Sequence, residues 1–294
     1  MGEHAPVMLE EAIAGLAVVP GGIYVDATYG RGGHSEAILA ALGESGALHA
    51  IDQDPEACAA AFRRHGARKN FRIHAASFDR LGEILAAEYL AGRVNGVLFD
   101  LGVSSPQLDD AARGFSFAND GPLDMRMNPQ AGVPASAWLA QADEKEIADV
   151  LWQYGEERDS RRIARAIAAA RAERPILRTA ELAEVILDAH RGPRQKIHPA
   201  TRSFQAIRIF INQELTRLPA ALAQARDALA PGGRLAVISF HSLEDRIVKR
   251  FIRDSEAVQP PALEKLERLF PSEAEAARNP RARSAVLRLA RRPS

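Results

Sequence analysis

Residues 26–35 have the sequence Asp26-Ala27-Thr28-Tyr29-Gly30-Arg31-Gly32-Gly33-His34-Ser35, and they follow a short β-type run, Ile23-Tyr24-Val25. A stretch rich in Ala and Leu comes next. Glycines at such a strand-to-helix turn let the backbone approach a ligand closely, where a Cβ would collide. An acidic residue about 20 positions later typically hydrogen-bonds ribose hydroxyls. Asp52 stands 52 − 33 = 19 positions after Gly33. The stretch therefore predicts an α/β fold that binds an adenosine-containing cofactor.

The turn departs from the pattern that binds a dinucleotide. A pyrophosphate site normally has G-x-G-x-x-G/A, but here Gly30-Arg31-Gly32-Gly33 is followed by His34, so the third glycine is missing. Asp26 also leads the turn, where a carboxylate repels phosphate and attracts a cation. The amino group or sulfonium of S-adenosylmethionine suits this carboxylate better. A nicotinamide-dependent oxidoreductase stays open as an alternative.

The composition is that of an ordinary globular protein. The chain has 294 residues, 47% of them hydrophobic and 26% charged, and its formal net charge is zero, so no global field draws it to nucleic acid. Cys58 is the one cysteine, which excludes a disulfide framework and favours a packed thiol over a nucleophile. We find no signal peptide and no apolar run of the ~18 residues that a membrane helix requires. The expected location is cytoplasmic.

The first third of the chain alternates strands and helices. Strands are expected at 23–27, 47–51, 71–75 and 97–99, and helices at 35–42, 54–65 and 79–90. Asp54 is a candidate N-cap, with Pro55 at the first helical position. Short apolar strands separated by helices predict a parallel sheet with right-handed crossovers.

The pattern changes between Leu108 and about Phe204, where no strand signal occurs. In this region helices are expected at 135–154, at 159–172 and from Thr179 as N-cap. The alternating unit then resumes, and its expected elements are a helix at 212–229, a turn at 231–233, a strand at 234–240, a helix at 243–254 and a hairpin of 265–269 with 285–289. The sequence therefore predicts a domain formed by 1–107 and 209–294, with a helical insertion at 108–208.

Two further segments leave the carboxyl ends of expected strands, where ligands sit in open α/β sheets. One is Asp100-Leu101-Gly102-Val103-Ser104-Ser105-Pro106-Gln107-Leu108-Asp109. Backbone carbonyls and a side-chain oxygen of such a loop can hold an exocyclic amine, although a Ser-Pro turn without chemistry is the alternative. The other holds His241, either at the rim of the active site or as a structural helix cap. Ser242 is a candidate N-cap of the next helix.

Two basic stretches and three phenylalanines are candidates for RNA contacts. Two stretches without acids hold several cations: Arg191, Arg194, Lys196, Arg202 and Arg208 at 189–213, with His190 and His198, and Arg278, Arg281, Arg283, Arg288, Arg291 and Arg292 at 276–294. Such local clusters suit a phosphate backbone, although a solvated surface explains them as well. Phe115, Phe117 and Phe204 are candidates to stack an extruded base, and a core position is the alternative.

Together these segments resemble the bacterial ribosomal small-subunit RNA (cytosine-N4)-methyltransferases over nearly the whole chain. The matching motifs are His4-Ala5-Pro6-Val7-Met8-Leu9, Gly30-Arg31-Gly32-Gly33-His34-Ser35, Ile51-Asp52-Gln53-Asp54-Pro55, the loop 100–109, Arg113-Gly114-Phe115-Ser116-Phe117, Gly121-Pro122-Leu123-Asp124-Met125-Arg126-Met127, Tyr154-Gly155-Glu156-Glu157-Arg158, His198-Pro199-Ala200-Thr201-Arg202, Ser239-Phe240-His241-Ser242-Leu243-Glu244-Asp245-Arg246 and Asn279-Pro280-Arg281-Ala282-Arg283-Ser284.

The resemblance implies a Rossmann-like class I S-adenosylmethionine-dependent methyltransferase with an inserted α-helical domain for substrate recognition. It implies methyl transfer to N4 of a cytidine in the decoding region of 16S ribosomal RNA, in the small ribosomal subunit. The cofactor contacts that it implies are Gly32, Gly33, His34, Asp52, Phe78, Asp100 and Gln107. Ser104, Ser105 and Pro106 are the candidates to hold the target amine. No metal ligand and no membrane contact are assigned, and a homodimer is left open.

One feature of the loop 100–109 departs from a related pattern. DNA amino-methyltransferases have an aromatic residue after the proline, but Gln107 follows Pro106 here. The residue that stacks on the base is therefore left open. A non-catalytic assembly factor that binds ribosomal RNA through a vestigial cofactor site is a further alternative.

Overall fold

The computed structural model describes residues 6–191 and 198–294. The chain divides into two compact units, one formed by residues 1–102 and 215–294 and the other by residues 103–214. The expected insertion, 108–208, is shorter than the second unit at both ends. Arg194 and Lys196 of the first basic stretch, and His4 and Ala5 of the first motif, lie outside the described residues.

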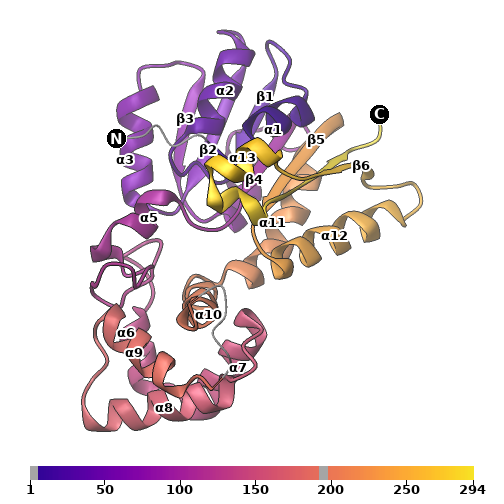
Figure 1. The fold of residues 1–294 in the computed structure, drawn as a ribbon. Helices are drawn as coiled ribbons and strands as arrows, with labels where there is room; N and C mark the ends of the chain where they lie inside the picture. Colours follow the sequence, from indigo (N-terminus) through magenta and orange to yellow (C-terminus); the bar gives the residue numbers. More distant parts are fainter. Residues whose placement is uncertain (1–5, 192–197) are drawn as a thin grey trace. The chain divides into compact units, whose positions relative to one another are not determined.

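The first unit is built on one mostly parallel sheet (Figure 1). In the described residues its seven strands have the order β3-β2-β1-β4-β5-β7-β6. Their bounds are Ile23–Asp26 (β1), Ala47–Asp52 (β2), Phe71–Ala75 (β3), Val94–Asp100 (β4), Leu229–Ser239 (β5), Glu264–Leu269 (β6) and Val286–Arg291 (β7). Strands β1 to β5 run parallel, whereas β7 is antiparallel to both of its neighbours. The predicted parallel sheet is confirmed.

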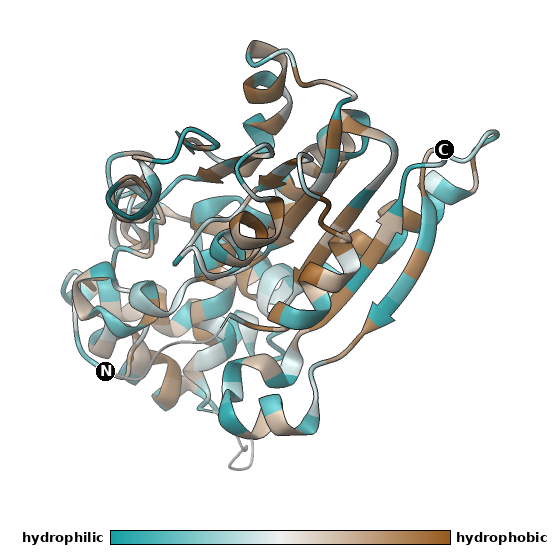
Figure 2. Cartoon of the chain, turned by 90° about the horizontal axis from the view of Figure 1, so that it is seen from above, coloured by the Kyte–Doolittle hydropathy of each residue, from teal (hydrophilic) through white to brown (hydrophobic). Residues whose placement is uncertain are grey.

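Helices cover both faces of this sheet. Helices α1 (Leu9–Leu16), α2 (Gly33–Leu42) and α3 (Pro55–His65) share a core with Leu48 and Ala50. Helices α4 (Leu81–Ala87), α11 (Glu214–Ala228) and α12 (Ser242–Glu256) share the other core with Ile51. Because successive strand residues point to opposite faces, strands covered on both sides must be apolar throughout. The central strands are accordingly brown in Figure 2.

Most expected elements of this unit are present, with differences at turns. Helix α3 begins as predicted, and the Asp54 carboxylate accepts the Glu56 N–H at 3.0 Å. The helix expected at 79–90 is a 3₁₀ turn, η1 (Phe78–Arg80), followed by the shorter α4. The predicted turn at 231–233 lies within β5. Val94 pairs with Leu229 and Gly96 with Arg234, so the β5 segment between these pairs is longer than the β4 segment and forms a bulge. The expected hairpin is antiparallel, but α13 (Glu273–Arg278) and η3 (Pro280–Ser284) connect β6 to β7.

The N-cap of α12 is His241, so the prediction of Ser242 as the cap is wrong. His241 Nδ1 accepts the Glu244 N–H at 3.4 Å. The Glu244 carboxylate in turn accepts the His241 N–H at 3.3 Å, and it also accepts the Phe240 N–H at 2.8 Å. An imidazole nitrogen therefore takes the capping position that a serine hydroxyl often fills, because the Glu244 side chain completes a reciprocal pair of bonds.

The described part of the second unit is helical. Its helices are α5 (Ser105–Asp109), η2 (Ala111–Arg113), α6 (Ala135–Gln141), α7 (Glu144–Gly155), α8 (Ser160–Glu173), α9 (Thr179–Ala189) and α10 (Ala200–Asn212). Their shared core includes Phe115 and Phe204, and the half-buried Phe117 packs 4.8 Å from the Phe204 ring. The core alternative is therefore confirmed for Phe115 and Phe204. Within the described ranges, no helix is long and apolar enough to cross a membrane.

Two local predictions in this unit are wrong, and one helix has no counterpart among the predicted elements. The single helix expected at 135–154 is divided into α6 and α7. Thr179 is the first residue of α9 and Arg178 is its N-cap, because the Thr179 hydroxyl is buried and accepts the Gly121 N–H at 3.0 Å. Helix α10 has no counterpart among the elements predicted from the sequence, since its Ile and Phe residues have only modest intrinsic helix propensity. Its buried positions Ala200, Phe204 and Ile207 nevertheless follow a helical spacing.

A buried ion pair attaches α12 to the last strand. The Arg288 guanidinium donates to Asp245 Oδ1 at 2.7 Å and to Oδ2 at 3.0 Å, and Arg288 is only 7% exposed. We expect Arg288→Ala to lower the free energy of unfolding by about 3 kcal/mol, because it leaves the Asp245 carboxylate poorly solvated. Urea unfolding measures this change. The control is Arg253→Ala, which removes an exposed pair with Asp254 and should cost at most about 0.5 kcal/mol. Equal effects of the two variants would contradict the prediction.

Candidate active site

Three aspartates end three adjacent strands of the first unit. Asp52 is the last residue of β2, Asp26 of β1 and Asp100 of β4. Since neighbouring parallel strands bring their carboxyl ends to one edge, the order β2-β1-β4 gathers these side chains. We call them the aspartate cluster. The structure therefore brings together Asp52 and Asp100, the two acidic residues predicted as cofactor contacts.

The turn after β1 is bonded to both neighbouring strands. The Gly30 N–H donates to Asp52 Oδ2 at 2.7 Å, and the Asp100 N–H donates to the Thr28 hydroxyl at 2.6 Å. The Thr28 N–H donates to Asp26 Oδ1 at 3.1 Å. Sequence reasoning did not assign a role to Thr28. Its position two residues after an aspartate is typical of an Asx-turn and was the available signal.

Gly32 and Gly33 are required by packing within the chain. Gly32 has φ +76° as the N-cap of α2, and a Cβ on it would lie 2.3 Å from the Tyr29 hydroxyl. A Cβ on Gly33 would lie 2.2 Å from Pro6 Cγ. Both positions therefore exclude larger residues whatever ligand the turn binds.

Asp26 and Asp52 are held by donors but remain costly to ionise. Asp26 is 1% exposed and accepts the Ser35 hydroxyl at 2.6 Å, and burial raises its pKa to about 6. Burial also raises the pKa of Asp52 to about 6, and the charges of Asp54 and Asp26 add to this shift. The Asp52 oxygens accept the N–H groups of Gly30 and Asp54. A carboxylate offers about four acceptor positions, so Asp52 retains capacity for ligand hydroxyls.

His34 and Asp100 face each other, with Nδ1 and Oδ2 3.5 Å apart. His34 Nε2 lies 3.1 Å from the Val7 carbonyl oxygen, which only accepts, so the ring proton belongs on Nε2. The Nδ1 lone pair therefore faces the Asp100 carboxyl. Burial raises the pKa of Asp100 well above its ordinary value, with smaller contributions from Asp26 and Glu244, and burial lowers the pKa of His34 to about 4. The His34 ring thus presents an acceptor nitrogen to the Asp100 carboxyl.

Asp100 also carries a buried acceptor atom with unused capacity. Its Oδ1 has no hydrogen-bond partner among the described residues. Phe78, which begins η1 after β3, is half-buried and meets the Phe99 ring edge to face at 6.1 Å. The same edge of the sheet therefore offers an unsatisfied carboxyl oxygen and an apolar ring.

Ser104, Ser105, Pro106 and Gln107 belong to the second unit. Ser104 is the N-cap of α5, and Gln107 is buried with its side-chain carbonyl accepting the Ser104 N–H at 2.9 Å. Gln107 therefore has a capping role within its own unit. A ligand contact from this residue stays a prediction.

The remaining candidates divide between structural and exposed positions. His241 caps α12, as the structural alternative expects. Its neighbour Glu244, which sequence reasoning passed over, is 2% exposed and adds negative charge near Asp100. The Cys58 thiol donates to the Asp52 carbonyl at 3.3 Å. Burial raises the pKa of Cys58 to about 12, so this thiol stays protonated.

Several arginines of the two basic stretches are used inside their own units. Arg208 pairs with Glu214, Arg288 with Asp245 and Arg291 with Glu264. By contrast, Arg191, Arg278 and Arg283 are exposed. Only part of each stretch is thus available to a phosphate backbone.

Comparison with known proteins places the whole chain in one group. The model of the MraW methylase family matches residues 1–293. A protein of Xanthomonas euvesicatoria named ribosomal RNA small subunit methyltransferase H is 55% identical, over 98% of this chain and 88% of the relative. A protein of the same name from Thioalkalivibrio sulfidiphilus is also 55% identical, over 98% of this chain and 97% of the relative. A solved rRNA methylase from Streptococcus thermophilus is 12% identical, with a TM-score of 0.47 over 100% of both chains.

The buried charge of Asp26 predicts a pH dependence of stability. Its folded pKa of about 6 exceeds the ordinary 3.8, so its stabilising contribution is complete below about pH 3.8 and is lost as the pH rises through 6. Asp26→Asn keeps the shape without the titration. We expect the free energy of unfolding of Asp26→Asn, relative to wild type, to rise by about 2 kcal/mol between pH 4.5 and 7.5.

Urea unfolding at several pH values measures this difference. The control is Asp227→Asn, at an exposed aspartate that pairs with Arg226. A difference between Asp26→Asn and wild type that does not change with pH would show that the Asp26 pKa is ordinary.

Proposed function

The chain belongs to the MraW methylase family, and on this premise we propose that it transfers a methyl group from S-adenosylmethionine to the N4 amine of a cytidine in small-subunit ribosomal RNA. Membership confirms the methyltransferase activity and the fold class expected from the sequence. The N4 position, the decoding region and the small-subunit context are parts of the proposal. The aspartate cluster is the observation that carries it.

The electrostatics of the cluster favour a cationic ligand. Asp26, Asp52 and Asp100 all have raised pKa values, and the charge of Asp26 contributes to the shifts of the other two. A positive ligand stabilises the ionised carboxylates, whereas a further anion raises their free energy. S-adenosylmethionine brings a sulfonium and an ammonium, so its charge matches. The pyrophosphate of a nicotinamide dinucleotide would add negative charge beside three carboxylates, which argues against the oxidoreductase alternative.

The residues present offer a fitting donor and acceptor set. Asp52 retains acceptor capacity for two ribose hydroxyls, and Asp100 Oδ1 has no described partner. We assign Asp52 to the ribose, Asp100 to the adenine amino group or the methionine end, and Phe78 to an apolar flank. We assign Gly32, Gly33 and His34, at the start of α2, to the cofactor as well. When bound, the cofactor supplies an electrophilic methyl group on its sulfonium.

The chain's own residues must orient the amine, because its lone pair is delocalised into the cytosine ring. We assign Ser104, Ser105 and Pro106 to holding the amine hydrogens through carbonyl and hydroxyl oxygens, which directs the lone pair at the methyl group. Gln107 positions the cofactor or the base. No covalent nucleophile is required, in agreement with the inert Cys58 thiol. The helical second unit, 103–214, supplies substrate recognition.

The partner that this proposal implies is ribosomal RNA within the small subunit, in the cytoplasm. Exposed Arg191, Arg278 and Arg283 are candidates for phosphate contacts. A non-catalytic assembly factor would use the same RNA contacts. It would have no need for three carboxylates that destabilise the unliganded protein, so the cluster favours an enzyme. A homodimer is compatible with either reading.

The ribose assignment predicts a loss of cofactor affinity in Asp52→Asn. The substitution removes one carboxylate acceptor, and hydrogen bonds to charged groups contribute about 1.5–3 kcal/mol, so we expect about 10- to 100-fold weaker binding of S-adenosylmethionine. Isothermal calorimetry at pH 7.5 measures the Kd. Asp254→Asn, at an exposed aspartate on α12, is the control. Unchanged affinity in a folded Asp52→Asn protein would end the ribose assignment.

The proposed reaction is tested on RNA. Cells that lack the chain should lose N4-methylcytidine from small-subunit RNA, and wild-type protein should restore it whereas Asp52→Asn restores less. Mass spectrometry of nuclease fragments locates the modified cytidine. Purified protein that binds small subunits but transfers no radiolabelled methyl group would establish the assembly factor instead. Transfer to another position or another RNA would disprove the N4-cytidine assignment.

A further inference from the structure

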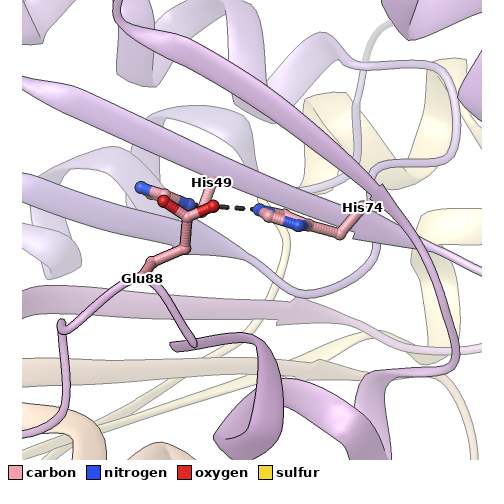
Figure 3. Close-up of side chains that lie close together, drawn as sticks. All are labelled: His49, His74 and Glu88. Carbon is pink, nitrogen blue, oxygen red and sulfur yellow. Dashed lines mark hydrogen bonds between the residues drawn. The ribbon is translucent and has the colours of Figure 1, made fainter. Parts of the chain in front are cut away.

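His49, His74 and Glu88 gather on one face of the sheet (Figure 3). In the pairing of β2 with β3, Ile51 lies opposite His74 and His49 opposite Arg72, so both imidazoles project from the same face. Ile51 belongs to the core that α4 covers, and Glu88 is the C-cap of α4. His49 precedes Asp52 by three residues, about 10 Å along the strand. The cluster is therefore separate from the aspartate cluster.

The three side chains lie close enough together for small side-chain rotations to form a metal site. His49 Nδ1 and His74 Nε2 are 3.1 Å apart. One nitrogen of each imidazole and a Glu88 carboxylate oxygen all lie within 4.8 Å of one another. Metal–nitrogen bonds of about 2.0–2.1 Å place neighbouring ligands of a tetrahedral site about 3.3 Å apart. The two nitrogens already have this spacing. Their rings point at each other, with centroids 5.4 Å apart, so each ring must turn to direct its lone pair at one ion. The Glu88 carboxylate needs to approach by about 1.5 Å, which rotation of a side chain at a helix end can supply.

The surroundings favour neutral imidazoles beside one carboxylate. His49 is 5% exposed, and burial lowers its pKa to about 4, with further lowering by His74 and Arg72 against an opposing effect of Glu88. Burial lowers the pKa of His74 as well. Neutral imidazole is the form that binds metals. Arg72 lies 3.7 Å from Glu88, but its side chain is 63% exposed and can turn away.

We propose that His49, His74 and Glu88 form a binding site for a divalent transition-metal ion of the zinc type. Two imidazoles and one carboxylate suit zinc, and they exclude magnesium and calcium, which prefer oxygen ligands. The three ligands come from β2, from the edge strand β3 and from the end of α4. The bound ion therefore fastens the edge strand to the sheet and to the helix above it, and it stabilises the first unit.

Zinc titration of the full chain, without a histidine tag and after removal of metals, tests this site. Calorimetry should give one tight site per chain, and cobalt in place of zinc should give visible absorption typical of four ligands. A zinc concentration about 100-fold above Kd should raise the Tm by about 5 °C, whereas magnesium should leave it unchanged. No stoichiometric zinc binding would overturn the proposal.

Variants of the ligands separate this site from surface binding. Loss of a hydrogen bond that supports a metal ligand weakens metal binding by about 10- to 100-fold. His74→Gln and Glu88→Gln remove a ligand itself, so each should weaken zinc binding by more than this. The controls are His198→Gln, at an exposed histidine, and Glu83→Gln, at a glutamate on α4 that pairs with Arg80. Both should bind zinc as wild type does. Circular dichroism and S-adenosylmethionine affinity establish that each variant is folded.

Arg72→Gln distinguishes a metal site from a histidine pair that is only hydrogen-bonded. It removes the cation that competes for Glu88, so zinc affinity should rise by about two- to fivefold. Unchanged zinc affinity in His74→Gln and Glu88→Gln, or weaker binding in Arg72→Gln, would overturn the proposal. Because zinc binding and thermal stability are read without RNA, these outcomes do not depend on methyl transfer.

Discussion

Crowding of carboxylates at one edge of a parallel sheet is the constraint on which the rest of this structure depends. Strands β2, β1 and β4 are neighbours that all run in one direction, so their final residues, Asp52, Asp26 and Asp100, must lie together. Desolvation raises all three pKa values, and the charge of Asp26 adds to the shifts of Asp52 and Asp100. A protein can keep such a cluster only where local donors hold the carboxylates and a ligand offsets their charge.

The turn after β1 provides these donors. Its backbone reaches Asp52 through the Gly30 N–H and Asp26 through the Thr28 N–H, while the Thr28 hydroxyl receives the Asp100 N–H. Such a turn needs a left-handed residue at Gly32, and the Tyr29 ring occupies the space of a Cβ there. The glycines, the threonine and the aspartates are thus parts of one hydrogen-bonded arrangement. A substitution at any of them removes part of this arrangement.

The sequence predicts the central arrangement because its signals are local. Apolar runs identify β1 to β4, and the distance from Gly33 to Asp52 identifies the acid that faces the turn. The failures occur where distant residues compete. Thr179 has the chemistry of an N-cap, but its hydroxyl bonds Gly121, 58 positions away. His241 caps α12 because the Glu244 side chain accepts the His241 backbone N–H in return. The contact of His34 with Val7 depends on tertiary folding. Pattern and propensity contain no information on such partners.

The energetics of the cluster connect folding to cofactor binding. Above pH 6 the unliganded protein bears the cost of ionised, buried Asp26 and Asp52, and a cationic ligand removes part of this cost as it binds. The aspartates therefore lower the free energy of unfolding of the unliganded protein and raise its affinity for a positive ligand. His49, three residues before Asp52 on β2, and His74 on β3 also have pKa values shifted by burial, but towards lower values. Both imidazoles can therefore accept a cation without first losing a proton.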